Sequence, residues 1–117
     1  MNLLPSTTTV LAPLAGLPDG QLSERELSIA GELESVLLLR HGEQVKGWLN
    51  VCPHAGRRLD YAPGMFLLSA AGEVVCPVHG ATFELEQGLC TAGPCRGQSL
   101  RALPLQVVDG QVLLLAL

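Results

Sequence analysis

Two short stretches, Cys52-Pro53-His54-Ala55-Gly56 and Cys76-Pro77-Val78-His79-Gly80, decide how this sequence is interpreted. Each stretch carries a cysteine with a proline directly after it, then a histidine, and ends at a glycine. A spacer of 21 residues separates His54 from Cys76. Each stretch is therefore expected to form a loop that presents one thiolate and one imidazole donor.

Two thiolates and two imidazoles, supplied in pairs by two loops, match a 2Fe–2S cluster with one cysteine-bound and one histidine-bound iron. The proline after each cysteine has a fixed φ and no N–H, so it stiffens the loop. The glycines let backbone N–H groups approach the sulfide atoms. The sequence thus predicts one 2Fe–2S cluster held by Cys52, His54, Cys76 and His79, and one-electron transfer as its function.

Composition and charge argue against several other classes of protein. The net charge is −4 and Lys46 is the only lysine, so the clustered basic residues that nucleic acid requires are missing. No apolar stretch reaches the roughly 20 residues that span a bilayer. Residues 1–20 contain no basic residue and three prolines, which argues against a secretory signal. We therefore expect a soluble cytoplasmic protein without a nucleic-acid or membrane partner, whose four cysteines favour metal binding over disulfides.

Strand signals and turn residues recur at short intervals and predict an all-β fold. A chain of 117 residues is long enough for one domain with a real core, so residues 1–117 are expected to form a single domain. Segment 57–72, apart from a short strand at 65–68, and segment 91–97 are expected to be irregular. The expected strands are 8–14, 24–29, 35–39, 44–51, 65–68, 73–76, 81–87, 100–108 and 111–116.

Additional residues extend the ligand pattern: Leu59, Phe83, Gly88 and Gly93-Pro94. Together with both ligand loops they resemble the Rieske 2Fe–2S family, and within it the small soluble Rieske-type ferredoxins. The resemblance implies a Rieske-type antiparallel β-sandwich that carries a small cluster-binding subdomain. It also implies that Cys52 and Cys76 bind the inner iron, that His54 and His79 bind the outer iron near solvent, and that Gly93-Pro94 belongs to a loop covering the cluster.

The sequence departs from the high-potential members of the family. Rieske proteins of respiratory cytochrome bc complexes carry a disulfide between the ligand loops, and here those loops contain no cysteine beyond the ligands. Those proteins also place Ser and Tyr hydroxyls where this sequence has Ala81 and Phe83. Because neither side chain can donate a hydrogen bond to the cluster, the potential is expected to be of order −150 mV, at the low end of the Rieske range.

Some residues allow a second interpretation. The four ligands could hold a tetrahedral zinc ion, although the long spacer and the fit of Phe83 to the Rieske pattern argue against it. Cys90 and Cys95 are interpreted as structural, reduced thiols, the alternatives being a disulfide or a second redox function. Trp48 is expected in the core and His41 in a solvated turn. Arg57 and Arg58, which follow the first ligand loop, are candidates for docking an acidic partner.

The expected function is that of a ferredoxin, an electron carrier between a reductase and a terminal oxygenase or reductase, and not of an enzyme. A Rieske oxygenase also needs a mononuclear iron held by two histidines and a carboxylate. His41, the one histidine outside the ligand loops, cannot supply that pair. One alternative is an accessory Rieske subunit, similar to the small subunit of nitrite reductase. The other is a redox sensor, which only Cys90 and Cys95 indicate.

Overall fold

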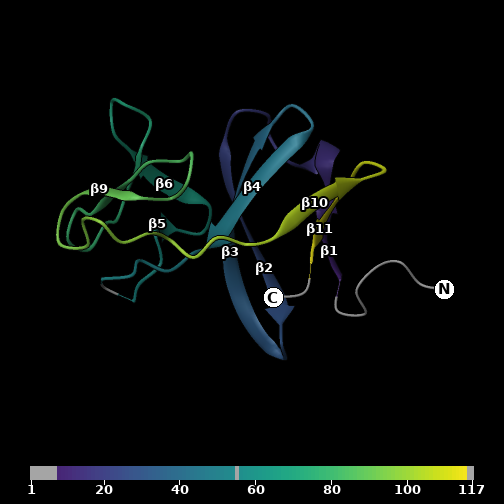
Figure 1. Ribbon diagram of the computed structural model, residues 1–117, viewed down its shortest axis with the longest axis horizontal. Helices are drawn as coiled ribbons and strands as arrows, with labels where there is room; N and C mark the ends of the chain where they lie inside the picture. Colours follow the sequence, from purple (N-terminus) through teal and green to yellow (C-terminus); the bar gives the residue numbers. More distant parts are fainter. Residues whose placement is uncertain (1–7, 55, 116–117) are drawn as a thin grey trace.

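The computed structural model describes residues 8–54 and 56–115, and within them the chain is built from strands (Figure 1). The helical segment found there is a short 3₁₀ turn, η1, so the all-β prediction is confirmed. No helix in the described part of the chain is long and apolar enough to cross a membrane. In chain order the elements are β1 (Thr9–Pro13), η1 (Leu14–Gly16), β2 (Leu22–Ile29), β3 (Glu32–His41), β4 (Gln44–Leu49), β5 (Asp60–Ala62), β6 (Met65–Leu68), β7 (Val74–Val75), β8 (Thr82–Phe83), β9 (Cys90–Ala92), β10 (Leu105–Val108) and β11 (Gln111–Leu114).

Two three-stranded antiparallel sheets form the base of the molecule. Their strand orders are β1-β11-β10 and β2-β3-β4. Their facing sides share one apolar core, to which Leu38 of β3 and Val112 and Leu114 of β11 contribute. This packing gives the β-sandwich expected from the sequence.

Strand β3 is buried on both sides because it lies between two cores. Its residues Val36, Leu37 and Leu38 are fully buried and Leu39 is 6% exposed. Successive side chains of a strand point to opposite faces. Val36 and Leu38 accordingly pack into the core of the base, whereas Leu37 and Leu39 pack into a second core that contains all four cysteines.

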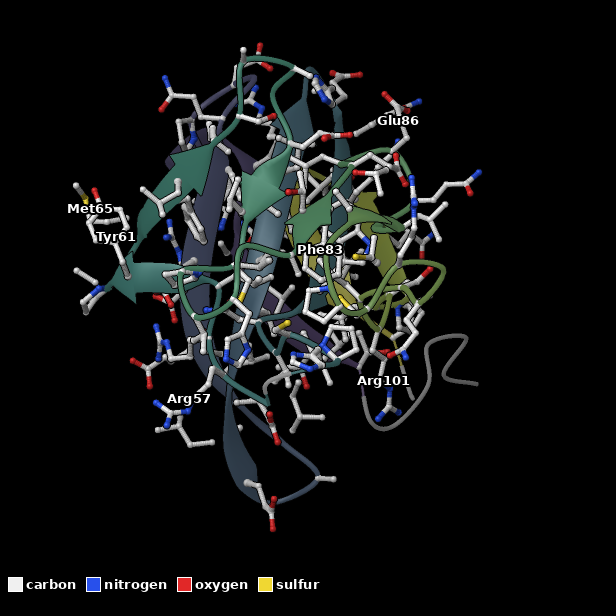
Figure 2. All side chains as sticks on the ribbon, turned by 90° about the vertical axis from the view of Figure 1, so that its left-hand side faces the viewer. Arg57, Tyr61, Met65, Phe83, Glu86 and Arg101 are labelled. Carbon is white, nitrogen blue, oxygen red and sulfur yellow. The ribbon has the colours of Figure 1, made fainter. Side chains whose placement is uncertain are left out.

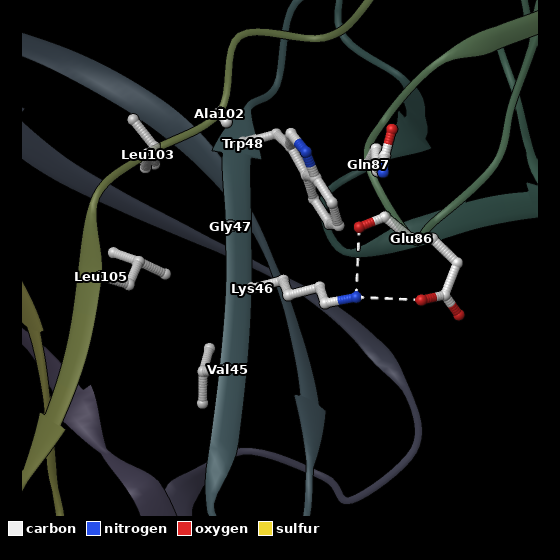
Figure 3. A pocket seen from close by; sticks show the side chains of 9 residues that line it. All are labelled: Val45, Lys46, Gly47, Trp48, Glu86, Gln87, Ala102, Leu103 and Leu105. Carbon is white, nitrogen blue, oxygen red and sulfur yellow. Dashed lines mark hydrogen bonds and ion pairs between the residues drawn. The ribbon is translucent and has the colours of Figure 1, made fainter.

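The second core belongs to a small subdomain made of the five short strands β5-β6-β7-β8-β9. This subdomain lies at one end of the elongated molecule, whose extents are 48 × 28 × 24 Å (Figure 1). Lys46 of β4 ties it to the base, because its Nζ atom lies 3.1 Å from both the carbonyl oxygen and a carboxylate oxygen of Glu86 (Figure 3).

The strand predictions for the base hold, but two segments expected to be irregular contain strands. Segment 57–72 includes β5, which was not expected and which forms a hairpin with the predicted strand β6, and residues 90–92 form β9, which pairs with β8. None of the strands β5, β6 and β9 is longer than four residues. Such short strands leave no alternation of polar and apolar residues to detect, because their pairing is fixed by the packing around them.

Candidate metal centre

The first ligand loop follows β4 and is closed by backbone hydrogen bonds. The N–H of Cys52 donates to the carbonyl oxygen of Arg57 at 2.8 Å, and the N–H of Gly56 donates to the carbonyl oxygen of Cys52 at 2.8 Å. Gly56 has a φ of 64°, a left-handed conformation that glycine adopts without steric cost. The turn therefore reverses the chain within a few residues of its cysteine.

The second ligand loop lies between β7 and β8 and repeats this pattern. The N–H of Cys76 donates to the carbonyl oxygen of Ala81 at 2.7 Å, and the N–H of Gly80 donates to the carbonyl oxygen of Cys76 at 2.9 Å. Gly80 has a φ of 75°. The two stretches singled out in the sequence are thus structurally equivalent loops.

The loops bring the four predicted ligands together in two layers. Cys52 and Cys76 are each 1% exposed and lie in the second core. His54 and His79 are exposed, and their ring centroids lie 5.1 Å apart with an interplanar angle of 69°. The thiols form an inner pair and the imidazoles an outer pair.

The thiol of Cys76 lies where burial and hydrogen bonding oppose each other. Burial raises its pKa, and the nearby Cys52 thiol raises it further. The backbone N–H groups of Val78 and His79 donate to the Cys76 sulfur and lower the pKa. These donors favour the thiolate, which is the form that binds a metal.

This donor set, two thiols and two imidazoles arranged in pairs, fits a two-iron cluster. A tetrahedral zinc site requires three or four protein ligands that converge on one point. Within residues 8–54 and 56–115, no group of three or more His, Cys, Asp or Glu side chains is arranged in that way. A cluster with two irons takes two protein ligands at each iron, which is the arrangement in pairs observed here.

The proline loop, residues 91–97, packs on both ligand loops. A Cβ atom on Gly93 would lie 2.8 Å from the Cα atom of Ala81, so only glycine allows this approach to the second ligand loop. On the other side, Cys95 is buried in the same core as Cys52 of the first ligand loop, close enough for Cys52 to raise the pKa of the Cys95 thiol. The three loops therefore form one packed unit.

Cys90 and Cys95 are a pair of buried free thiols next to this unit. Their sulfur atoms lie 3.1 Å apart, and the Cys90 thiol also donates to the carbonyl oxygen of Ala92 at 3.2 Å. Burial raises the pKa of Cys95 to about 12, so the group is a protonated thiol at neutral pH. Both residues are free thiols in the structure, and that they stay reduced is still a prediction.

Ala81 and Phe83, the positions expected to lack a hydroxyl, are both buried against the ligand loops at 1% and 0% exposure. The neighbouring Thr82 does carry a hydroxyl, but it donates to the carbonyl oxygen of Gly80 at 3.2 Å. Trp48 is buried and His41 is exposed, as predicted.

A ring of five polar side chains, which we call the Asn50–Asp60 ring, was not predicted from the sequence. Asn50 and Asp60 are buried at 1% and 7% exposure. The side-chain amide oxygen of Asn50 (Oδ1) accepts a hydrogen bond from the backbone N–H of Leu59 at 2.8 Å. The ring is closed by hydrogen bonds and one ion pair. The hydrogen bonds, each written from donor to acceptor, are Ser35 to Glu24 (2.6 Å), Asn50 to Ser35 (3.0 Å), Asn50 to Asp60 (3.0 Å) and Arg58 to Asp60 (2.9 and 2.7 Å). The ion pair joins Arg58 to Glu24 (3.2 Å).

The ring attaches the chain that leaves the first ligand loop to strands β2, β3 and β4. The Arg58 guanidinium lowers the pKa of Asp60 to about 2, and Asp60 in turn raises the pKa of Arg58. Arg58 therefore has a structural role, although its side chain stays 42% exposed, and its role in docking stays a prediction. Arg57 is exposed (Figure 2). A sequence gives no periodic signal for such a ring, because its members come from four separate segments.

The family was tested by comparison with known proteins. A family model for the Rieske [2Fe-2S] domain matches residues 8–109. The chain belongs to the Rieske 2Fe–2S family. Its cofactor is accordingly one 2Fe–2S cluster. No curated protein sequence matches this Rieske domain.

Several solved structures share the fold of this Rieske domain. The ferredoxin of carbazole 1,9a-dioxygenase from Nocardioides aromaticivorans IC177 is 29% identical, with a TM-score of 0.72, and covers 96% of this chain and 100% of its own. The terminal oxygenase of the same system is 26% identical, with a TM-score of 0.71 over 97% of this chain and 31% of its own. A terminal oxygenase from Novosphingobium sp. KA1 is 20% identical with a TM-score of 0.74, a likeness of fold alone. The Rieske domain is thus an electron-transfer protein of ferredoxin type.

Proposed function

We propose that Cys52 and Cys76 bind the inner iron of the cluster and that His54 and His79 bind the outer iron. The observation that carries this proposal is the equivalence of the two ligand loops, which bury both thiols and leave both imidazoles exposed. When bound, the cluster accepts and releases one electron. The exposed imidazole pair gives the outer iron the shorter route to a partner protein.

The residues around the ligands have separate tasks in this proposal. The N–H groups of Val78 and His79 stabilise the Cys76 thiolate. The proline loop excludes water from the side facing Ala81, where Gly93 packs closely. The second core surrounds both cysteines with apolar side chains, so the inner iron site is dry.

We further propose a low potential for this centre. Reduction adds one negative charge, which hydrogen-bond donors stabilise. Ala81 and Phe83 supply none, and the hydroxyl of Thr82 is directed to a backbone carbonyl. The midpoint potential should therefore be of order −150 mV. A clearly positive midpoint in voltammetry would overturn this part of the proposal.

The proposed biological role is that of a ferredoxin that carries electrons from a reductase to a terminal oxygenase or reductase. The similarity to the ferredoxin of a carbazole dioxygenase, which spans that whole chain, supports the oxygenase alternative. On this ground we favour the ferredoxin role over an accessory subunit of a nitrite reductase or a redox sensor. That the chain is not itself an enzyme, that it lies in the cytoplasm and that residues 1–117 form one domain stay predictions from the sequence.

The ligand assignment is tested by metal analysis and single replacements. Aerobically purified protein should contain about two irons and two acid-labile sulfides per chain. His54→Ala and His79→Ala should each lose or convert the cluster, whereas His41→Ala, a histidine outside both loops, should keep it. Stoichiometric zinc without sulfide, or an intact cluster in either ligand variant, would refute the assignment.

A further inference from the structure

The three loops that meet around the ligands are free of acidic residues, although the chain as a whole is acidic. Residues 51–58, 76–81 and 91–97 contain no Asp or Glu, but they contain Arg57, Arg58 and Arg96. The whole chain has 11 acidic and 7 basic residues. The charge is therefore distributed unevenly between the two ends of the molecule.

The imbalance follows the division between base and subdomain. The segment 51–103, which holds the subdomain, carries four arginines and four acidic residues. The remaining segments, 1–50 and 104–117, carry seven acidic and three basic residues, which accounts for the whole net charge of −4. An approaching ion thus meets a neutral subdomain and an acidic base.

The four carboxylates of the subdomain all have partners within the protein. Asp60 binds Arg58, and Glu86 binds Lys46. Glu73 accepts the hydroxyl of Thr91 at 3.2 Å. Glu84 accepts the backbone N–H groups of Glu86, Gln87 and Leu89, and although burial opposes it, these bonds lower its pKa.

The positive charges of Arg57 and Arg96 are not balanced by an ion pair of this kind among the residues that the structure describes. Both are exposed, and neither makes an ion pair with another residue in the described part of the chain. In Figure 2, which looks onto this end, Arg57 lies at the edge opposite Glu86. Arg57 belongs to the first ligand loop and Arg96 to the proline loop, and Cys52 and Cys95 of these two loops are buried in the same core.

Apolar side chains accompany these arginines. Val51 and Val78, each next to a ligand loop cysteine or histidine, are 40% and 42% exposed. An interface typically combines an apolar centre with a polar rim, and arginine is enriched in it. The exposed residues Val51, Val78, Arg57 and Arg96 lie on or directly beside the three loops and supply both components; we call this set the cationic tip.

We infer that the cationic tip is the docking surface for a redox partner protein whose own contact surface is rich in Asp and Glu. This inference rests on the proposed function, since it names the partner chemistry for the same site. Complementary charge would orient the partner on the imidazole end and raise the association rate, even though this chain carries a net charge of −4.

Electron transfer to small charged oxidants tests the sign of the charge at the tip. The reduced protein is mixed in a stopped-flow instrument with ferricyanide, a trivalent anion, or with tris(phenanthroline)cobalt(III), a trivalent cation. Each takes one electron and leaves the cluster oxidised. We expect the ferricyanide rate to fall as salt is added, because screening weakens attraction to the tip. A rate that rises with salt, as the net charge of −4 would require, would overturn the inference.

Charge-matched variants locate the effect. Arg57→Gln and Arg96→Gln each change the net charge by −1, and so does Gln106→Glu on the exposed face of β10 in the base. At about 10 mM ionic strength, each arginine variant should slow ferricyanide roughly threefold and speed the cobalt complex, whereas Gln106→Glu should change either rate by much less. Equal effects of all three variants would refute a localised tip.

Competition experiments test the class of partner. Polyglutamate should slow oxidation of the wild-type protein by ferricyanide, and polylysine should not. Binding to phosphatidylserine vesicles but not to polyglutamate would assign the surface to a membrane and overturn the inference. The visible spectrum of the cluster is recorded first, because its absence would refute the proposed function, whereas an intact cluster with the wrong salt dependence would refute the docking surface alone.

Discussion

At the scale of single residues, the potential of the cluster depends on what the buried positions beside the ligands can donate. Ala81 and Phe83 fill space against the second ligand loop without offering a hydrogen bond. Replacing them with hydroxyl residues of similar size therefore changes the hydrogen bonding more than the packing.

Ala81→Ser and Phe83→Tyr should each raise the midpoint potential. A new hydrogen bond that favours the reduced state by about 1 kcal/mol corresponds to about 40 mV for one electron. Voltammetry of the purified variants measures the shift. Phe83→Leu is the control, since it alters packing without adding a hydroxyl and should leave the potential unchanged. An equal rise in Phe83→Leu would contradict the explanation.

Cys90 and Cys95 are expected to be dispensable for the cluster. Both thiols are buried in the second core, and a serine hydroxyl in such a place costs about 1–3 kcal/mol when it finds no good partner. The double variant Cys90→Ser/Cys95→Ser should therefore unfold more easily but keep the iron content and the visible spectrum. Cys52→Ser, the contrasting variant, should lose the cluster. Loss of iron from the double variant would show that the ligand set is wrong or incomplete.

At the scale of structural elements, the Asn50–Asp60 ring holds the first ligand loop to the base. Asp60 has a pKa of about 2 in the folded protein, below the ordinary 3.8, so its charged form stabilises the fold. This stability is fully present above pH 4 and is lost as the pH falls through about 2. It amounts to about 2 kcal/mol.

Asp60→Asn should lower the free energy of unfolding at pH 6 by roughly this amount and flatten the decline below pH 4. Guanidinium denaturation at several pH values measures both effects. Asp109→Asn removes the same charge from the exposed turn between β10 and β11. It should change neither the free energy of unfolding at pH 6 nor the decline below pH 4. A full acid-induced decline in Asp60→Asn would assign the pH dependence to other groups.

The sequence predicted the two ligand loops and the strands of the base more reliably than the elements between them. A Cys-Pro turn with histidine and glycine is a local signal, and the strands of the base are long enough to show alternation. Strand β5 has no such signal, because its position depends on Asp60, which accepts a hydrogen bond from Asn50 of another segment. The structural role of Arg58 was missed for the same reason.

At the scale of the whole molecule, two cores share strand β3. Leu37 and Leu38 are neighbours of equal size, both fully buried, and they point into different cores. The pair offers a direct comparison between the core that holds the cysteines and the core of the base.

Leu37→Ala and Leu38→Ala should each cost 2–5 kcal/mol of stability, the range for removing a buried leucine side chain. Only Leu37→Ala should also speed the bleaching of the cluster under native conditions, because only its cavity lies in the core with Cys52 and Cys76. The decay of visible absorbance in the presence of a chelator measures this rate. Equal bleaching in both variants would mean that the two cores open together.

The exposed imidazole pair lies at one end of a molecule 48 Å long, so in the proposed function electrons enter and leave through the same place. Donor and acceptor then cannot be bound at once, and the carrier must visit them in turn. Turnover depends on how fast each complex separates, and a partner that binds too tightly becomes an inhibitor. In a reconstituted chain, electron delivery should rise and then decline as the donor is added in excess. A plateau without decline would indicate a second exit.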